Sequence, residues 1–154
     1  MSWDILIQDF GDYADLDSIP DSFSPSSLGS RARLIERITA AIPSSNFSDP
    51  AWGIIDMDDG SVEANMGEED VCKSVMLHVR GGASAFELVS TIVGCLPGRA
   101  FDCQHNSFLD ESTGQDSFVE WRDYRDHVVA DYNTPRAPHS LFSRIKRAFF
   151  GPSE

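Results

Sequence analysis

The segment from residue 52 to residue 80 constrains the fold most strongly, because it holds three strand-like runs separated by short turns. The runs cover residues 52–57, 61–66 and 73–80. Asp59-Gly60 lies between the first two, and this pair is preferred in tight hairpin turns. Connections this short join antiparallel neighbours. We therefore predict an antiparallel meander, with residues 73–80 as a central strand.

One further strand and two helices are predicted around this meander. Residues 3–7 alternate between apolar and polar positions, as a half-buried strand does. Ser30 is a candidate N-cap for a helix that ends before Pro43, and Ser84-x-x-Glu87 resembles a capping box for a helix that ends at Pro97-Gly98. Residues 100–103 form a candidate edge strand. The fold class is α+β, with a mainly antiparallel four- to five-stranded sheet and two helices on one face.

The C-terminal third changes character and predicts additional helices. A second candidate capping box, Ser117-x-x-Glu120, precedes a helix that reaches Tyr132. Residues 140–150 place apolar side chains opposite basic ones, as in a short amphipathic basic helix. We expect these C-terminal helices to cover an edge or the other face of the sheet. The chain, 1–154, is interpreted as a single domain, with residues 1–103 as its α/β core and 104–154 as a helical extension.

Negative charge is concentrated in the first half of the chain. The net charge is −13, and residues 1–70 carry fifteen acids against three arginines. Such a surface repels nucleic acid and attracts a basic protein, so we expect no direct nucleic-acid contact. The uncharged apolar stretches are short and the N-terminus is acidic, so we expect a cytoplasmic protein that does not associate with membranes.

Three motifs suggest chemistry, and each has a structural interpretation that we favour. The run from Asp56 to Gly60 has clustered acids, but its spacing differs from a calcium loop and fits a hairpin turn. Cys103-x-His105 offers two soft metal ligands where a zinc site needs about four. Arg80-Gly81-Gly82 lacks the spacing of a phosphate loop. We therefore expect no catalytic residue, no metal and no cofactor.

Several sequence blocks are similar to a known protein family. They are SWDILIQDF, SIPDSFSPSSLGSRARLIERI, NFSDPAWGIID, SVEANMGEEDVCKSVMLHVRGG and RAFD, which together span about residues 2–103. In their order and spacing they resemble small acidic bacterial immunity proteins, which are encoded beside secreted antibacterial toxins of the type VI secretion kind. The resemblance implies binding to a cognate toxin, with a nuclease effector as the suggested partner. It implies no catalytic residues.

The predicted function is inhibition by tight binding, in which acidic side chains and aromatic anchors face a basic active site. The candidate partner-binding residues lie in a loop, a hairpin and a turn: Asp12, Tyr13, Asp15, Asp17, Trp52, Asp56, Asp58, Asp59, Glu63, Glu68, Glu69 and Asp70. Trp52 is equally a candidate core residue, because it shares its run with Ile54. A small-molecule-binding or regulatory domain, and a peripheral membrane adaptor that uses residues 140–150, remain as alternatives.

Overall fold

The computed structural model describes residues 1–110 and 114–133. The chain divides into two compact units, Met1–Asp123 and Tyr124–Glu154. The predicted basic helix at residues 140–150 lies outside the described residues. Among the helices that the structure describes, none combines the length and the hydropathy needed to cross a bilayer.

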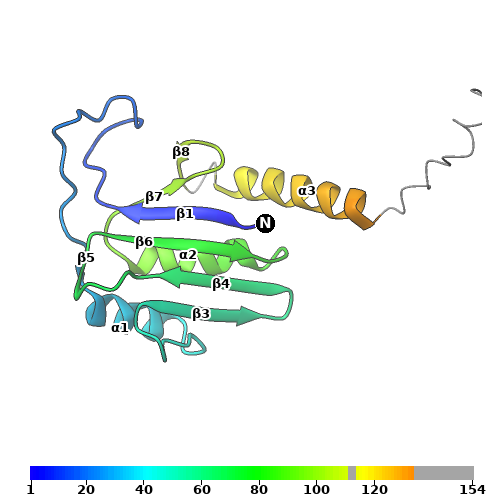
Figure 1. Ribbon diagram of the computed structural model, residues 1–154, viewed down its shortest axis with the longest axis horizontal. Helices are drawn as coiled ribbons and strands as arrows, with labels where there is room; N and C mark the ends of the chain where they lie inside the picture. The colour runs from blue at the N-terminus through cyan, green and yellow to red at the C-terminus, as the bar shows by residue number, and fades with distance from the viewer. Residues whose placement is uncertain (111–113, 134–154) are drawn as a thin grey trace, which may run out of the picture. The chain divides into compact units, whose positions relative to one another are not determined.

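The first unit is built on a six-stranded sheet in which all pairs are antiparallel (Figure 1). Its order is β3-β4-β6-β1-β7-β8. The strands are β1 (Trp3–Gln8), β3 (Trp52–Met57), β4 (Gly60–Asn65), β6 (Ser74–Arg80), β7 (Arg99–Asp102) and β8 (Ser107–Phe108). The α+β class and the antiparallel meander are confirmed, and β6 is central. The sheet exceeds the predicted four to five strands because β8 pairs with β7, which is therefore not the edge.

A second, two-stranded sheet joins distant parts of the chain. It pairs β2 (Gly29–Ser30) with β5 (Val71–Cys72), and the Leu28 amide donates to the Cys72 carbonyl at 2.8 Å. This pairing places the end of the loop after β1 beside the turn that follows β4. Strands of two residues carry no recognisable alternation, which is why the sequence did not indicate them.

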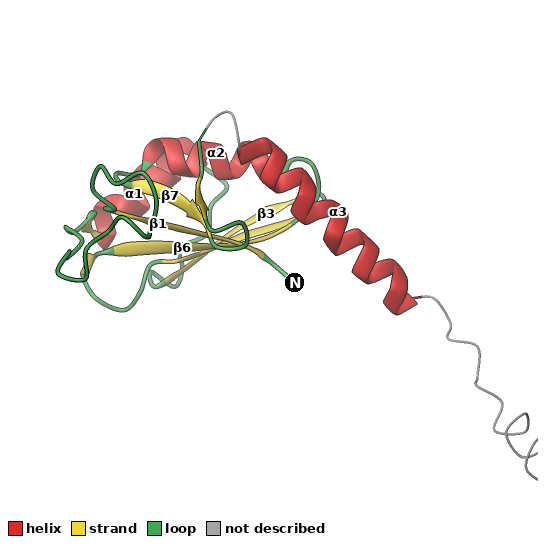
Figure 2. Ribbon diagram, turned by 90° about the horizontal axis from the view of Figure 1, so that it is seen from above, coloured by secondary structure: helices red, strands yellow, loops and turns green. Residues whose placement is uncertain are grey.

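Two helices, α1 (Arg31–Ala41) and α2 (Ala85–Cys95), cover one face of the sheet (Figure 2). In β1 the apolar side chains Trp3, Ile5 and Ile7 point toward the helices and are buried. Leu34 and Ile38 of α1 and Val89 and Ile92 of α2 meet them in the core. Burial of aliphatic side chains at about 1.5–3 kcal/mol each is the main stabilising contribution of this layer.

The two predicted caps have different outcomes. The Ser30 hydroxyl accepts a hydrogen bond from the Arg33 amide at 3.4 Å, so the N-cap of α1 is confirmed. The predicted capping box at Ser84 is wrong, because Ser84 has helical backbone angles and makes no side-chain cap. Its hydroxyl donates to the carboxylate of Asp59. Ser84 therefore links the start of α2 to the β3–β4 hairpin.

The third helix, α3, spans Gly114–Asn133 and begins three residues before the predicted cap at Ser117. Within the first unit, Phe118 and Trp121 pack against Trp3, with ring centroids 5.2 and 6.5 Å away. Trp3 points to the same side of the sheet as α1 and α2. The expectation that the C-terminal helices cover an edge or the other face is therefore wrong for this part of α3, because its aromatic residues complete the core on the helix side. In the second unit, the described end of α3 exposes Tyr132 and brings His127 Nε2 within 3.8 Å of Asp131 Oδ2.

Candidate functional site

The face of the sheet opposite α1 and α2 carries a mixed polar and apolar surface. Its central row is defined by strand register: Trp52 pairs with Asn65, Asn65 with Met76, and Met76 with Leu6. The next row contains Ile54, Glu63, His78 and Asp4. We call this surface the open face, and it consists of Asp4, Leu6, Trp52, Ile54, Asp56, Glu63, Asn65, Met76, His78 and Arg80.

Trp52 is held in place on the open face by a short chain of contacts. Its side chain is half-buried, and its ring stacks on that of His78 with centroids 5.6 Å apart and planes 16° apart. His78 Nδ1 lies 2.8 Å from Asp4 Oδ1 on the next strand. The neighbouring Ile54 is 39% exposed. Trp52 is therefore neither a core residue nor a freely rotating one, and it can offer a positioned aromatic surface to a partner.

Two of the predicted acidic residues also lie on the open face, and their settings differ. Glu63 is half-buried and forms an ion pair with Arg80 on the adjacent strand. Asp56 is exposed, in the row that contains Ser61 and Arg80. The Glu63 charge is thus largely balanced within the sheet, whereas Asp56 contributes negative charge to the surface.

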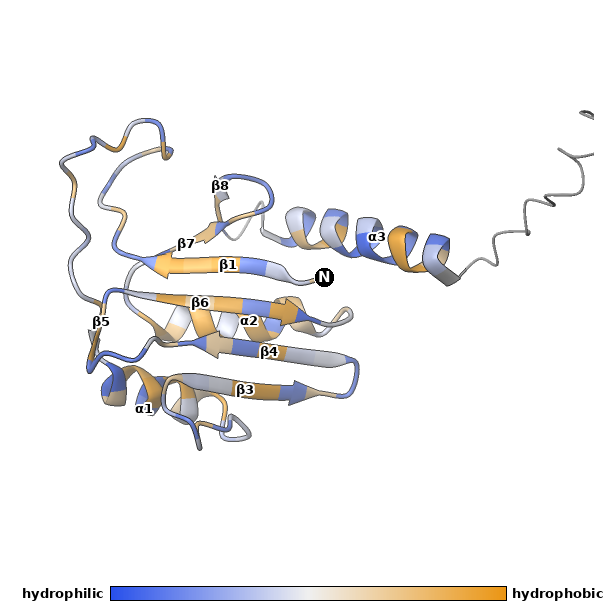
Figure 3. Cartoon of the chain, in the orientation of Figure 1, coloured by the Kyte–Doolittle hydropathy of each residue, from blue (hydrophilic) through white to orange (hydrophobic). Residues whose placement is uncertain are grey.

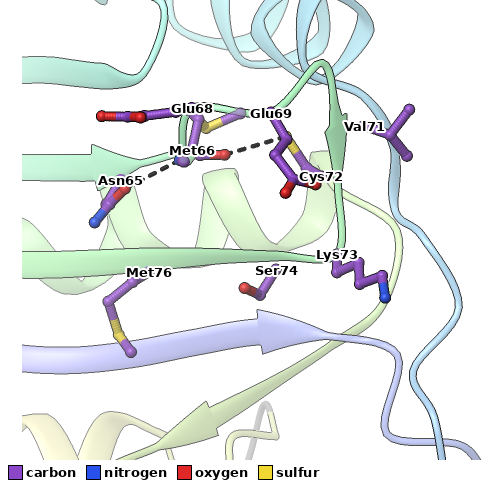
Figure 4. Close-up of a pocket in the computed structure, with 10 residues that line it drawn as sticks. Asn65, Met66, Glu68, Glu69, Val71, Cys72, Lys73, Ser74 and Met76 are labelled. Atoms are coloured by element: carbon purple, nitrogen blue, oxygen red, sulfur yellow. Dashed lines mark hydrogen bonds between the residues drawn. The ribbon is translucent and has the colours of Figure 1, made fainter.

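A cavity of about 240 Å³ lies at one end of the open face, between the segment that follows β4 and the start of β6 (Figure 4). Met66 and Cys72 form buried parts of its wall, and Met76 forms a half-buried part. Figure 4 shows the Glu69 carboxylate extending from the turn toward the start of β6, while Glu68 points along β4. This end of the face therefore combines an apolar wall with a carboxylate.

Arg31 holds the turn of residues 67–70 against α1. Its Nη1 donates to the Gly67 carbonyl at 2.8 Å, and its backbone amide donates to the Asp70 carbonyl at 2.8 Å. Its Nη2 lies 3.5 Å from Asp70 Oδ1. Asp70 consequently belongs to the α1 side of the turn. Gly67 has φ +74°, a left-handed conformation that glycine adopts without strain. The three predicted acids of this turn thus point in different directions.

The acidic loop of residues 9–28 is anchored at both ends. Phe10 packs against Phe101 and Phe108, with ring centroids 5.8 and 5.1 Å away, and covers the β7–β8 end of the sheet. The Arg99 guanidinium lies 3.6 Å from the centre of the Phe108 ring and donates to the Tyr13 carbonyl at 2.6 Å. Aromatic and cation–π contacts therefore fix the place where this loop crosses the sheet edge.

Asp9 closes the same loop through its carboxylate. The Gly11 amide donates to Oδ1 at 2.9 Å and the Ser26 amide donates to Oδ2 at 3.0 Å. These hydrogen bonds, that from Gly11 first, hold the pKa of Asp9 below its ordinary value because they stabilise the ionised form. The predicted site residue Tyr13 is half-buried with its ring edge on Phe23, so it is partly used by the loop itself. The remaining predicted acids of the loop are exposed: Asp12, Asp15 and Asp17.

The structure does not bring all the predicted acidic residues together. Residues 58–59 lie at the β3–β4 tip, whereas the acidic loop and the 67–70 turn lie at the opposite end of the sheet (Figure 1). The six residues of β4 alone separate these ends by about 20 Å. Asp59 is also engaged in the fold, since its carbonyl accepts from the Gly82 amide and its carboxylate from Ser84. Figure 3 shows the β3–β4 tip and the turn that follows β4 as hydrophilic.

Sequence reasoning missed a buried polar group on the helix side of the sheet. Asp102 is fully buried, and the Trp3 indole donates to its Oδ2 at 2.9 Å. His105 Nδ1 lies 2.8 Å from the same oxygen, and His105 Nε2 lies 3.3 Å from Glu120 Oε2. A single acidic residue at the end of a strand gives no sequence signal for such a network. Its members bind β7, the following turn and the first turns of α3 to one another.

The residues of the candidate metal and phosphate motifs make contacts with other residues of the fold. Both ring nitrogens of His105 face carboxylates, and the pKa of Cys103 is raised by partial desolvation and by the nearby Asp4 and Asp102 carboxylates, which disfavours its thiolate. In residues 1–110 and 114–133, no three His, Cys, Asp or Glu side chains are grouped to hold a metal ion. In the Arg80-Gly81-Gly82 turn, the candidate phosphate loop, the Gly82 amide donates to the Asp59 carbonyl. Comparison with known proteins found no matching family, no matching curated protein and no matching solved structure.

Proposed function

We propose that this protein binds a basic protein partner through the open face and neutralises it without catalysis. The observation that carries the proposal is the positioned aromatic residue Trp52, which lies on a sheet face that α1 and α2 leave uncovered. Aromatic side chains that are held in place and surrounded by smaller contacts supply much of the binding energy of protein interfaces. Ile54, Leu6 and Met76 provide such surroundings.

The charge around the open face indicates the sign of the charge that a partner surface should carry. Asp56 is exposed on the open face, and Glu68 and Glu69 are exposed at its β5 end. The acidic loop, with Asp12, lies at that same end of the sheet. Negative potential around an aromatic centre increases the association rate of a positively charged protein and disfavours acidic competitors. A basic surface is therefore the complement of this face.

A nuclease toxin is the partner class that we propose. An enzyme that acts on nucleic acid must attract phosphate, so its active-site cleft is basic. An acidic face that covers the cleft would exclude the substrate. The resemblance of residues 2–103 to immunity proteins supports the same partner class. In this proposal no residue of the chain has a catalytic role.

The test is protection of cells from a toxin. The intact protein is co-expressed with the product of an adjacent gene that is toxic when expressed alone, and growth is measured. We expect the unaltered chain to restore growth and Trp52→Ala to lose protection. In calorimetry with the purified toxin, Trp52→Ala should weaken binding by about 2 kcal/mol or more, as expected for a central aromatic anchor. Glu36→Gln, on the exposed side of α1, removes one negative charge away from the open face and serves as the control.

Two outcomes would contradict the proposal at different points. If a folded Trp52→Ala variant protects cells as well as the unaltered chain, the open face is not the binding surface. If the unaltered chain fails to protect cells against the adjacent toxic product, the neutralising function is wrong. Thermal unfolding of each variant separates a lost contact from a lost fold.

A further inference from the structure

We propose that the cavity beside the 67–70 turn receives an arginine side chain of the basic partner. This inference rests on the proposed function and adds to it the part of the partner that is recognised. The cavity is continuous with the open face, because Asn65 and Met76 line it and both belong to the row that contains Trp52. A partner that contacts Trp52 would therefore have an adjacent side chain within reach of the cavity.

The shape and lining of the cavity suit a long side chain that is apolar along its stem. Its volume is about 240 Å³, whereas one water molecule occupies roughly 30 Å³ of liquid. Met66 and Cys72 present a thioether and a thiol along the wall, and Met76 also lines the cavity. These soft groups pack readily against methylene groups. Arginine buries such a stem while its charged end stays near polar groups.

The carboxylate of Glu69 supplies the complementary charge. It extends over the cavity in Figure 4, and within the described chain it makes no ion pair. Lys73 is the one cation among the lining residues, and Figure 4 shows its amine directed away from Glu69. A guanidinium is more weakly hydrated than an ammonium and matches a carboxylate with two parallel hydrogen bonds. These properties favour arginine over lysine.

The receiving wall is already in place before a partner binds. The Cys72 thiol donates to the Met66 carbonyl at 3.2 Å, and the Gly67 amide donates to Asn65 Oδ1 at 3.0 Å. Arg31 fixes the other side of the turn through the Gly67 carbonyl. A partner side chain would therefore enter without the cost of ordering this segment.

The inference is tested on the full chain with a small arginine probe. The protein carries ¹³C-methyl methionine, and Nα-acetyl-L-arginine amide is titrated while the methyl signals are followed by NMR. We expect the signals of Met66 and Met76 to shift, and that of Met57, at the far end of β3, to stay in place. Nα-acetyl-L-citrulline amide has nearly the same shape without the charge, and it should cause little change.

Glu69→Gln should weaken arginine binding about two- to five-fold, the range for one partly exposed ion pair. Glu36→Gln lowers the net negative charge equally and should leave the titration unchanged. The inference is overturned if citrulline amide shifts the same signals equally, if Met66 and Met76 do not respond, or if Glu69→Gln has no effect. If the arginine probe does not bind but Trp52→Ala loses protection, only the arginine site is rejected. If the arginine probe binds but the unaltered chain does not protect cells, the toxin-neutralising function is rejected and the arginine site is still supported.

Discussion

The two faces of the six-stranded sheet are built from the same strands, yet they meet different surroundings. On β3, Ile55 points toward the helices and is 1% exposed, while its neighbour Ile54 is 39% exposed on the open face. On β1, Ile5 is buried and Asp4 contacts His78. Because side chains alternate along a strand, consecutive residues point to different faces of the sheet. Side chains of the helix-covered face determine stability, and those of the open face are available for recognition.

The sharpest test of this division uses the two neighbouring isoleucines. Ile55→Ala removes a buried side chain and leaves a cavity, so we expect it to lower the free energy of unfolding by about 2–5 kcal/mol. Ile54→Ala is the matched control, and its expected cost is about 1 kcal/mol or less, because much of the side chain is already in water. Urea denaturation followed by circular dichroism measures both. Equal costs for the two variants would contradict the division of the faces.

A second test concerns the polar group inside the helix-covered face. Asp102→Asn would leave the Trp3 indole or His105 without a full acceptor in a buried place. We expect a loss of about 1–3 kcal/mol in unfolding free energy, the usual cost of an unsatisfied buried polar group. Binding of the toxin by the folded variant should be unchanged. If Asp102→Asn strongly weakens the Trp52-dependent binding of the toxin, the two faces are coupled.

The smallest expected effect lies in the acidic loop and appears at low pH. The Gly11 and Ser26 amides stabilise ionised Asp9, so its pKa is lower in the folded chain than in the unfolded one. The stabilisation is fully present above the ordinary aspartate pKa and is lost as the pH falls through the lowered value of the folded state. NMR titration of the Gly11 and Ser26 amides should therefore show a midpoint below the ordinary aspartate range. Asp9→Asn should abolish this transition, and a midpoint at or above the ordinary range would contradict the role of Asp9.

Much of the helix-covered layer could be predicted from the sequence, because burial produces periodic patterns. The strands at residues 3–8 and 52–80 and the two helices of the core followed from alternation and from an apolar stripe. Local signals were less reliable where tertiary neighbours compete. Ser84 has the sequence of a cap, but its backbone is helical and its hydroxyl donates to the Asp59 carboxylate of a distant hairpin. The two-residue strands β2, β5 and β8 are too short to produce a pattern.

The candidate site was less predictable than the fold, because proximity in sequence does not give direction in space. The sequence grouped Asp58 and Asp59 with the 68–70 turn, although β4 lies between them and carries the chain to the opposite end of the sheet. Within the turn itself, Arg31 draws Asp70 toward α1 and away from Glu69. The cavity was not predictable either, since it needs the bend after β4 and the start of β6 to lie side by side. The sequence suggested Trp52 as an aromatic anchor, and its support by His78 appears only when the strands are paired.

The outer edge of β3 limits how this protein can associate. The Ile54 amide and carbonyl both pair with Asn46, at 2.9 and 2.8 Å, and the Trp52 amide donates to the Asp49 carbonyl at 3.1 Å. These contacts use backbone groups that an incoming strand would need. The segment of residues 46–49 therefore disfavours the addition of a further strand at this edge of the sheet.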